Sequence, residues 1–187
     1  MSLSPSAQKI CAVAVGHFAE FGYDGSALSV IAEQAGMRKA SLYAHFANKD
    51  ALFSEVLDIA LREEGLAASA CFGASPGTRL SGGQYLDSLQ TRYESSAHFR
   101  FMLRTVYAPP LALREEIVTK YQRFEENLRA LFIAGLPQQI EPADATTVTD
   151  AYLGIVDSLQ VELIFTSPEN YEARRQALWK ILQHYPI

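Results

Sequence analysis

Apolar positions recur at helical spacing along nearly the whole chain, and no stretch alternates apolar and polar residues over the length of a strand. The first segment opens with Ser4 and Pro5, a capping residue followed by a proline at the first helical position, and stops at Gly22. Its apolar positions follow one face and comprise Ile10, Ala14, Phe18 and Phe21. The pattern therefore predicts a helix between Ser4 and Gly22.

Two shorter helices are expected next, joined by a glycine. Ser26 can cap the first, and Gly36 can end it in the left-handed conformation that glycine adopts without steric cost. The second covers roughly residues 38–45, and Asn48 can cap a longer helix over about residues 49–66. The inward apolar positions of the two short helices are Leu28, Ile31, Ala32, Ala35, Met37, Leu42 and Phe46.

Proline and glycine divide the rest of the chain. Loops are expected around Pro76 and at residues 81–83, and prolines mark the boundaries near Pro109, Pro137 and Pro168. The sequence thus predicts an all-α fold of about nine helices, without internal repeats. The later helices are expected over residues 84–95, 97–107, 110–134, 144–165 and 168–183.

A short helix, a glycine turn and a second short helix form a helix-turn-helix. Ala32, Gly36 and Met37 supply the small residue, the glycine and the apolar residue that its geometry needs. The second helix then turns its polar side outward, where arginine or lysine can bond guanine O6 and N7 and hydroxyls can bond phosphate. The outward residues are Arg38, Lys39, Ala40, Ser41, Tyr43, Ala44 and His45.

The net charge of −5 argues at first against nucleic acid, but its distribution matters more. Residues 1–50 carry equal numbers of basic and acidic side chains, so the acidic excess lies beyond residue 50. Lys49, close behind Arg38 and Lys39, stands at a helix N-terminus, where backbone N–H groups also favour a phosphate. Because salt screens charges beyond about 10 Å, a local basic face can bind DNA on an acidic protein.

Other classes of protein fit the sequence poorly. Cys11 and Cys71 show no CxxC spacing, so we expect two packed thiols, and no run approaches the ~18 apolar residues of a membrane span. There is no HExxH, GxSxG or phosphate-binding glycine loop, and Glu94 and His98 lack the spacing of di-iron bundles. We therefore expect a soluble cytoplasmic protein without enzymatic activity, metal, cofactor or membrane partner.

Several motifs in the first part of the chain together resemble the N-terminal signature of the TetR-type (tetracycline-repressor-like) transcriptional regulators. The motifs are F-x-x-F-G-Y at 18–23, I-A-x-x-A-G at 31–36, L-Y-x-H-F at 42–46, and Asn48-Lys49 followed by Leu52. Beyond them the likeness is one of length and helical content. The resemblance implies a DNA-binding domain over residues 1–50 and an effector-binding and dimerisation domain over residues 51–187.

The resemblance also assigns DNA-binding roles. The residues expected at base edges are Arg38, Lys39 and Ala40. The residues expected at phosphates are Ser41, Tyr43 and Lys49. Ser29, on the preceding helix, also faces DNA. His45 belongs to the outward group, although packing is the simpler reading for it. The family often has serine or threonine at position 38 and glycine at position 40. Arg38 cannot cap the helix, which lowers helix stability by about 1 kcal/mol, and this loss is understandable if Arg38 reads a base such as guanine.

The segment over residues 144–165 is apolar on two faces, and such a helix needs two packing partners. One face comprises Val148, Tyr152, Ile155, Leu159 and Leu163, and the other comprises Ala151, Gly154, Ser158, Val161 and Phe165. The second face is small in its middle, so we expect it to meet a second copy of the chain. The last helix would complete a four-helix interface through Tyr171, Leu178, Trp179 and Leu182. The alternative is that both faces are internal core.

In TetR-type regulators the middle helices enclose a small-molecule pocket whose occupation moves the DNA-binding heads apart. The resemblance implies effector contacts from Tyr85, Tyr93, His98, Phe99, Met102, Tyr107, Phe124 and Tyr152, although residues of this kind are more often ordinary core residues than ligand contacts. Few charges interrupt these positions, so an apolar or aromatic effector is expected. The expected function is a homodimeric repressor that such an effector releases from a pseudo-palindromic double-stranded DNA operator. The alternative is an interaction or adaptor protein of the same fold without sequence-specific DNA binding.

Overall fold

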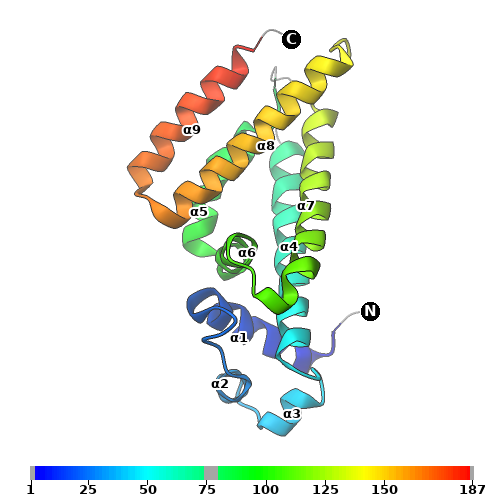
Figure 1. The fold of residues 1–187 in the computed structure, drawn as a ribbon, viewed down its shortest axis with the longest axis vertical. Coiled ribbons are helices and arrows are strands. Elements are labelled where there is room, and N and C mark those ends of the chain that lie inside the picture. The colour runs from blue at the N-terminus through cyan, green and yellow to red at the C-terminus, as the bar shows by residue number, and fades with distance from the viewer. Residues whose placement is uncertain (1–2, 74–79, 186–187) are drawn as a thin grey trace. The chain divides into compact units, whose positions relative to one another are not determined.

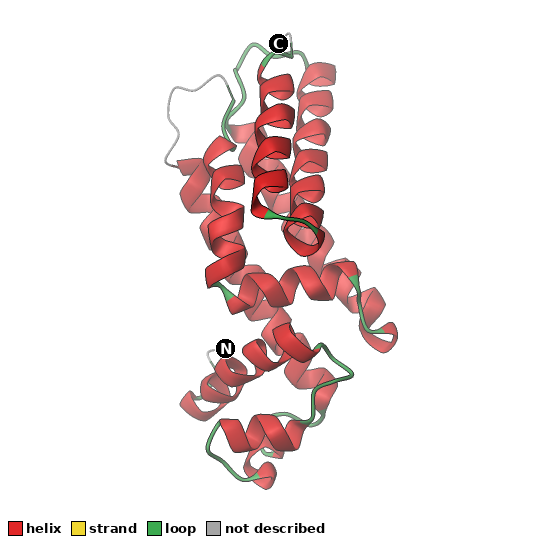
Figure 2. Ribbon diagram, turned by 90° about the vertical axis from the view of Figure 1, so that its left-hand side faces the viewer, coloured by secondary structure: helices red, strands yellow, loops and turns green. Residues whose placement is uncertain are grey.

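The structure, a computed structural model, describes residues 3–73 and 80–185. Within these ranges it contains nine α-helices, one short 3-10 helix and no β-strand (Figure 1 and Figure 2). The predicted all-α class is therefore confirmed. The loop expected around Pro76 lies outside the described residues.

The helices follow the expected order along the chain. The first five are α1 (Pro5–Phe21), α2 (Leu28–Gln34), α3 (Lys39–Tyr43), α4 (Lys49–Gly73) and α5 (Gly83–Ser95). They are followed by α6 (Ala97–Tyr107), the 3-10 helix η1 (Leu111–Leu113), α7 (Arg114–Ala134), α8 (Pro142–Phe165) and α9 (Pro168–Gln183).

Hydroxyl and amide side chains cap the helices where the sequence placed them. Ser4 Oγ accepts a hydrogen bond from the Ala7 amide, with Pro5 as the first helical residue, and Gly22 ends α1 at φ 69°. Asn48 Oδ1 accepts from the Ala51 amide at 2.8 Å. These side chains satisfy backbone groups that a helix end leaves without an internal partner, which is why the ends are predictable.

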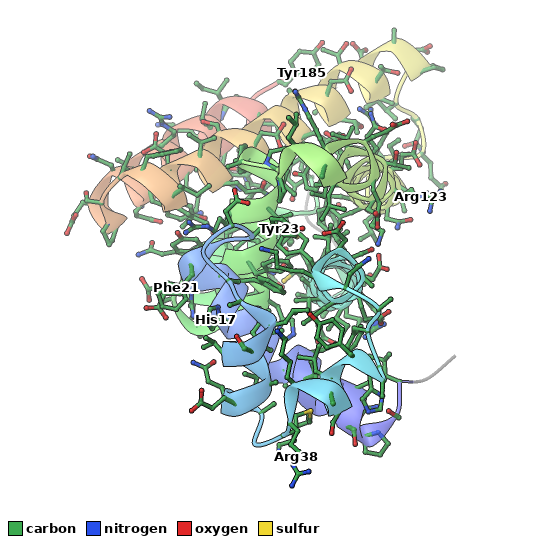
Figure 3. The ribbon with its side chains drawn as sticks, turned by 60° about the horizontal axis from the view of Figure 1, so that its bottom comes forward. His17, Phe21, Tyr23, Arg38, Arg123 and Tyr185 are labelled. Atoms are coloured by element: carbon green, nitrogen blue, oxygen red, sulfur yellow. The ribbon has the colours of Figure 1, made fainter. Side chains whose placement is uncertain are left out.

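Four expectations about the elements were wrong. Ser26 does not cap α2, whose N-cap is Ala27, because the Ser26 hydroxyl donates to the Gly22 carbonyl at 2.6 Å. Phe21 belongs to the apolar stripe of α1 by spacing but is 48% exposed at the helix end, where its ring lies 4.7 Å from that of His17 (Figure 3). Helix α4 continues past residue 66, and the expected start of α7 at residue 110 is the separate η1 turn.

The described chain forms two compact units, which we call the first and the second unit. The first comprises Met1–Glu64 and Ser96–Tyr121, and the second comprises Gly65–Ser95 and Gln122–Ile187. In the first unit α1 packs extensively on α6, so α6 belongs to the same compact body as the helix-turn-helix. The division of function at residue 50 stays a prediction.

Three phenylalanines form the centre of the first unit. Phe18 of α1, Phe53 of α4 and Phe101 of α6 are buried, and the rings of Phe18 and Phe53 meet edge to face at 4.9 Å. The Phe53 and Phe101 rings meet in the same way at 5.0 Å. Edge-to-face pairs of this kind add about 0.5–1.5 kcal/mol to the stabilisation from burial.

A polar cluster joins α7 to α4 within the first unit. Lys120 Nζ lies 2.8 Å from an Asp58 oxygen, 2.9 Å from a Glu116 oxygen and 2.6 Å from Ser54 Oγ, and the Ser54 hydroxyl also donates to Glu116. Burial alone would lower the pKa of Lys120, but the bonds to Asp58 and Glu116 outweigh it and raise that pKa. The bonds from Ser54 and Lys120 hold the pKa of Glu116 below its ordinary value.

An aromatic cluster forms the centre of the second unit. The Tyr152 ring stacks on Phe132 at 4.1 Å, and its hydroxyl donates to the Gly82 carbonyl at 3.0 Å. Burial raises the pKa of Tyr152, so the hydroxyl remains a neutral donor. Tyr171 of α9 is also buried and donates to the Leu86 carbonyl at 2.6 Å. These bonds fix α5, α8 and α9 against one another.

Candidate nucleic-acid interface

The turn between α2 and α3 has the geometry that its glycine predicts. Gly36 adopts φ +66°, and its amide donates to the Glu33 carbonyl at 2.9 Å. The Met37 amide donates to the Ala32 carbonyl at 3.0 Å. This pair of bonds is the Schellman motif, which ends a helix and reverses the chain sharply. The predicted helix-turn-helix corner is therefore confirmed in its backbone.

Helix α3 is buried on one side and open on the other. Leu42 is fully buried and Phe46 nearly so, and Met37, expected inside, is half-buried. The exposed group is the one predicted from the sequence: Arg38, Lys39, Ala40, Ser41, Tyr43, Ala44 and His45. Two cations and two hydroxyls thus share one solvent-facing surface, which suits phosphates and base edges.

Arg38 precedes α3 as its N-cap and makes no side-chain capping bond. Figure 3 shows its side chain extended away from the protein into solvent. Lys39 Nζ lies 5.8 Å from the centroid of the Tyr43 ring, within the range of a cation–π contact. Ser29 is exposed on α2. These side chains are free to approach a duplex without rearrangement of the helices.

Two further residues lie at this surface although the sequence analysis did not select them. Lys9 of α1 brings its Nζ to 3.6 Å from the position that a Cβ on Gly36 would occupy. Val30 of α2 is 38% exposed beside Ser29. Lys9 adds a third cation near the turn. Its position depends on how α1 packs on α2, for which the sequence carries no local signal.

Lys49 lies differently from the other predicted DNA contacts. Its Nζ donates to the Tyr23 carbonyl at 2.8 Å and to the Ser26 carbonyl at 3.2 Å, within the connection between α1 and α2. The ammonium also lies 4.0 Å from the centroid of the Tyr23 ring. Its predicted phosphate contact stays a prediction, and the structure gives the side chain other partners.

The comparisons with known proteins bear on this geometry. The sequence profile of the bacterial regulatory proteins of the tetR family matches residues 10–56, the segment that runs from α1 through the helix-turn-helix into α4. Residues 10–56 therefore carry the DNA-binding signature of the TetR-type regulators of transcription. The match places the DNA-binding helix-turn-helix in the same part of the chain as the sequence motifs did.

Solved structures share the fold of the whole chain. A TetR-family regulator from Cytophaga hutchinsonii has a TM-score of 0.74 at 18% identity, covering 97% of this chain and 96% of that one. A protein from Mesorhizobium loti MAFF303099, described as a putative TetR-family regulator, has a TM-score of 0.72 at 16% identity, covering 96% and 97%. FadR from Bacillus subtilis, solved in complex with stearoyl-CoA, has a TM-score of 0.67 at 15% identity, covering 96% and 99%. No curated protein sequence matches the chain.

The predicted effector residues fall into both compact units. The first unit holds His98, Phe99, Met102 and Tyr107, and the second holds Tyr85, Tyr93, Phe124 and Tyr152. Most are buried, whereas Tyr107 is 38% exposed. In the second unit Tyr85 and Tyr152 both lie near the Phe72 ring, at 6.2 and 6.0 Å. A role in effector binding stays a prediction for all eight.

His98 lines a surface cavity of about 420 Å³ together with Cys11 and Glu55. Burial, with the charge of Arg62, lowers the pKa of His98 against the opposing effect of Glu63. Burial also raises the pKa of Cys11 to about 12, with a smaller contribution from Glu55. The thiol is therefore protonated and unreactive, as expected for a packed cysteine.

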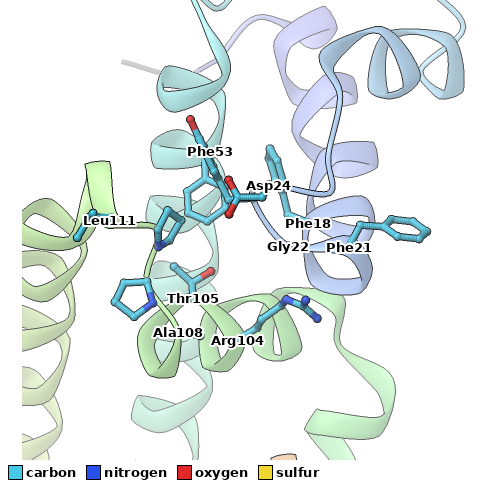
Figure 4. Close-up of a pocket in the computed structure, with 12 residues that line it drawn as sticks. Phe18, Phe21, Gly22, Asp24, Phe53, Arg104, Thr105, Ala108 and Leu111 are labelled. Carbon is cyan, nitrogen blue, oxygen red and sulfur yellow. The ribbon is translucent and has the colours of Figure 1, made fainter.

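A second cavity of the first unit, of about 290 Å³, was not expected from the sequence (Figure 4). Phe18, Phe53 and Thr105 line it, and it opens beside the Pro109–Pro110 pair. Arg104 of α6 reaches across to the end of α1, where its guanidinium donates to the Glu20 carbonyl at 3.3 Å. The cavity thus lies where α6 meets the connection that leads into α2.

The two faces of α8 differ as the pattern predicts. Val148, Tyr152, Ile155 and Leu159 are buried, whereas Ala151 and Gly154 are exposed and Ser158 is half-buried. The open face and α9 line an apolar groove of about 360 Å³, whose lining includes Ile181 at 70% exposure. Phe165, at the end of α8, is 74% exposed. Among the described residues, no helix is both long and apolar enough to cross a bilayer, and no cluster suited to a metal ion occurs.

Proposed function

We propose that this TetR-type regulator is a dimeric repressor that binds a pseudo-palindromic operator and leaves it when an apolar or aromatic molecule binds. The observation that carries the proposal is the exposed basic surface of α3, held by the buried Leu42 and the Gly36 turn. Functionally, residues 1–50 would bind DNA and residues 51–187 would bind effector and partner.

Recognition of DNA would divide between base and phosphate contacts. Arg38 has the length and the two-pronged donor group to bond guanine O6 and N7 in the major groove. Lys39 lies beside it, and Ala40 is small enough to let the helix approach the base edges, with His45 one turn further on. The hydroxyls of Ser29, Ser41 and Tyr43 are exposed and suited to phosphates, which fix the register of the helix.

Dimerisation would use the open face of α8 together with α9. A five-residue recognition helix contacts few base pairs, and helix-turn-helix proteins gain affinity by placing two such helices in successive major grooves. Exposed Ile181 lines a groove together with Gly154 and Ala151, and Phe165 of α8 is also exposed, so both helices present apolar side chains to water. The small residues let a partner helix approach closely.

Effector binding would depend on the aromatic cluster of the second unit. Its rings supply apolar walls, and the hydroxyl of Tyr152 supplies a polar group. FadR from Bacillus subtilis, which shares this fold, was solved with stearoyl-CoA, a ligand with a long apolar chain. For the present regulator this supports an apolar ligand but no particular compound. Four of the predicted effector contacts instead belong to α6, which packs on α1, so a ligand bound at α6 would also disturb the packing of α1.

Selection from a library of random duplexes, followed by gel shifts across a range of salt concentrations, tests the proposal. We expect a pseudo-palindromic duplex that binds more tightly than unselected DNA and whose affinity falls steeply with salt. Failure to select any duplex at low salt would favour the adaptor alternative. A selected duplex without dyad symmetry would contradict the dimeric mode alone.

A further inference from the structure

We propose that the cavity of about 290 Å³ in the first unit is a binding site for a small aromatic carboxylic acid, whose carboxylate is held by Thr105 and Arg104. We call it the head cavity. Its described lining residues all belong to the first unit, and none of the eight predicted effector contacts is among them. The acid site is therefore separate from the effector site proposed above.

Aromatic rings form the apolar wall of the head cavity. Phe18 and Phe53 line it, and both are buried in the core of the first unit, which fixes their rings. A planar ligand ring can pack against them, because aromatic rings attract one another at centroid distances of about 4.5–7 Å. The volume lies at the lower end of the range typical of ligand sites, so the cavity suits a molecule with one ring.

A buried hydroxyl lines the same cavity. Thr105 is only 3% exposed, and Figure 4 shows it among the lining residues. Thr119, Thr149 and Thr166 lie in helices and donate to the carbonyl four residues earlier. For Thr105, no such bond occurs, and no other group in the described part of the chain bonds its hydroxyl. Because a buried hydroxyl without a partner is unfavourable, an acceptor on a ligand would bind there.

Arg104, the preceding residue of α6, brings a positive charge to the cavity. Its guanidinium donates to the Glu20 carbonyl at 3.3 Å, and its Nε lies 3.0 Å from the position that a Cβ on Gly22 would occupy. The guanidinium therefore lies against the end of α1. Among the described residues the Glu20 carbonyl is its one acceptor, so the remaining N–H groups can bind a carboxylate through two parallel bonds.

The polar groups of the head cavity favour an acid over an amine. A carboxylate can accept from Arg104 and from the Thr105 hydroxyl, whereas an ammonium group would meet the charge of Arg104. Asp24 also lines the cavity and would repel a carboxylate, but it is exposed, so solvent weakens that repulsion. Asp24 should therefore reduce the affinity for an acid without preventing its binding.

A bound acid would contact two segments of the first unit. Arg104 and Thr105 lie in α6, whereas Gly22 and Asp24 belong to the connection that follows α1 and leads into α2. A ligand that binds the folded protein and not the unfolded chain stabilises it by an amount that grows with ligand concentration. The acid should therefore raise the thermal midpoint of the protein.

The test compares the full-length wild type with Thr105→Val, Arg104→Gln and Asp24→Asn. Isothermal titration calorimetry measures binding of benzoate and phenylacetate, with benzylamine as the probe of opposite charge, at a temperature where circular dichroism shows each variant folded. Thr149→Val and Arg123→Gln are the matched controls, because they remove a buried hydroxyl and an exposed guanidinium from helices of the second unit.

We expect saturable binding of an acid to the wild type. Thr105→Val and Arg104→Gln should each weaken it roughly tenfold, the scale of a lost hydrogen bond to a charged group, and both controls should bind like the wild type. Asp24→Asn should strengthen binding by up to about fivefold, because it removes a like charge. Thr105→Val should be at least as stable as the wild type without ligand, but the acid should raise its thermal midpoint less.

Failure of both acids to bind the wild type, or binding that neither Thr105→Val nor Arg104→Gln weakens, would overturn the proposed site. Tighter binding of benzylamine than of benzoate, or weaker acid binding in Asp24→Asn, would overturn the acid as the class of ligand. These measurements are made without DNA. Their failure would leave the proposed repressor function standing, and failure to select a duplex would leave the acid site standing.

Discussion

Arg38 occupies the N-cap position of α3 without capping it. Serine or threonine at this position would satisfy a backbone amide of α3 and stabilise the helix by about 1 kcal/mol. Instead, the guanidinium extends into solvent (Figure 3). Arg38 thus lacks the stabilising effect of a cap but has a long exposed donor, which is consistent with reading of a base. Replacing Arg38 by a capping residue should therefore change DNA affinity and protein stability in opposite directions.

Arg38→Thr is expected to raise the free energy of unfolding by up to about 1 kcal/mol, because threonine can cap α3. The same variant should bind the selected duplex about 1–3 kcal/mol more weakly and discriminate less at one base pair of each half-site. Urea unfolding and anisotropy on duplexes with single base-pair changes measure the two effects. Arg38→Thr with undiminished discrimination at every base pair would show that Arg38 reads no base.

Gly82 is a second position at which one residue decides the local structure. It adopts φ +96°, and a Cβ there would lie 2.7 Å from the Tyr152 hydroxyl oxygen. Gly82→Ala should therefore lower the free energy of unfolding by at least about 1–2 kcal/mol from backbone strain alone. Gly65→Ala is the control, since a Cβ on this α4 residue meets nothing within 4 Å and alanine favours helix by roughly 1 kcal/mol. Equal stability of the two variants in urea would contradict the close contact with Tyr152.

At the scale of elements, the Lys120 cluster makes the attachment of α7 to α4 dependent on pH. The pKa of Glu116 is lowered on folding, so its stabilisation is present above its ordinary value near 4.5 and is lost as pH falls through the folded value. The pKa of Lys120 is raised, so its contribution is lost only as pH rises through the folded value above 10.5. The cluster should stabilise the protein throughout the neutral range.

We expect Glu116→Gln to be less stable than the wild type at pH 7, with a difference that shrinks as pH falls below about 4.5, the ordinary carboxyl value. Urea unfolding between pH 3 and 8, followed by circular dichroism, measures the difference. Glu115→Gln, on the neighbouring exposed position, is the control. A Glu116→Gln difference that stays constant across this range would show that the carboxylate charge contributes nothing.

Short sequence patterns predicted most of the helices, but they did not predict the contacts between residues that lie far apart in the sequence. Helices α6 and α9 begin and end at the predicted residues. Their starts are predictable because Ser96 and Ser167 cap them, and a capping serine can be recognised from the sequence. Ser26 reads locally as a cap but bonds Gly22 and His17 instead. Lys49 reads as a phosphate ligand, yet its partners lie 23 and 26 positions earlier. Which carbonyls lie within reach depends on packing between helices, which short patterns do not encode.

At the scale of the whole molecule, the open face of α8 and the adjoining α9 predict self-association. Phe165→Glu or Ile181→Glu should convert a dimer into a monomer at micromolar concentration, because each buries a charge in an apolar contact. Leu111→Glu is the control, since Leu111 is 88% exposed, belongs to the first unit and does not line the groove. Sedimentation velocity separates the outcomes. A monomeric wild type at this concentration would remove the dimer from the proposal.

Methylation interference on the selected duplex tests the central claim most directly, because it reports contacts to guanine N7 in the major groove. The account predicts interference at guanines in two symmetry-related half-sites, with centres about 34–36 Å apart or a multiple of that spacing. It also predicts that Arg38→Thr abolishes interference at one guanine of each half-site. Binding that tolerates methylation at every guanine of the duplex would contradict an α3 that reads guanine in the major groove.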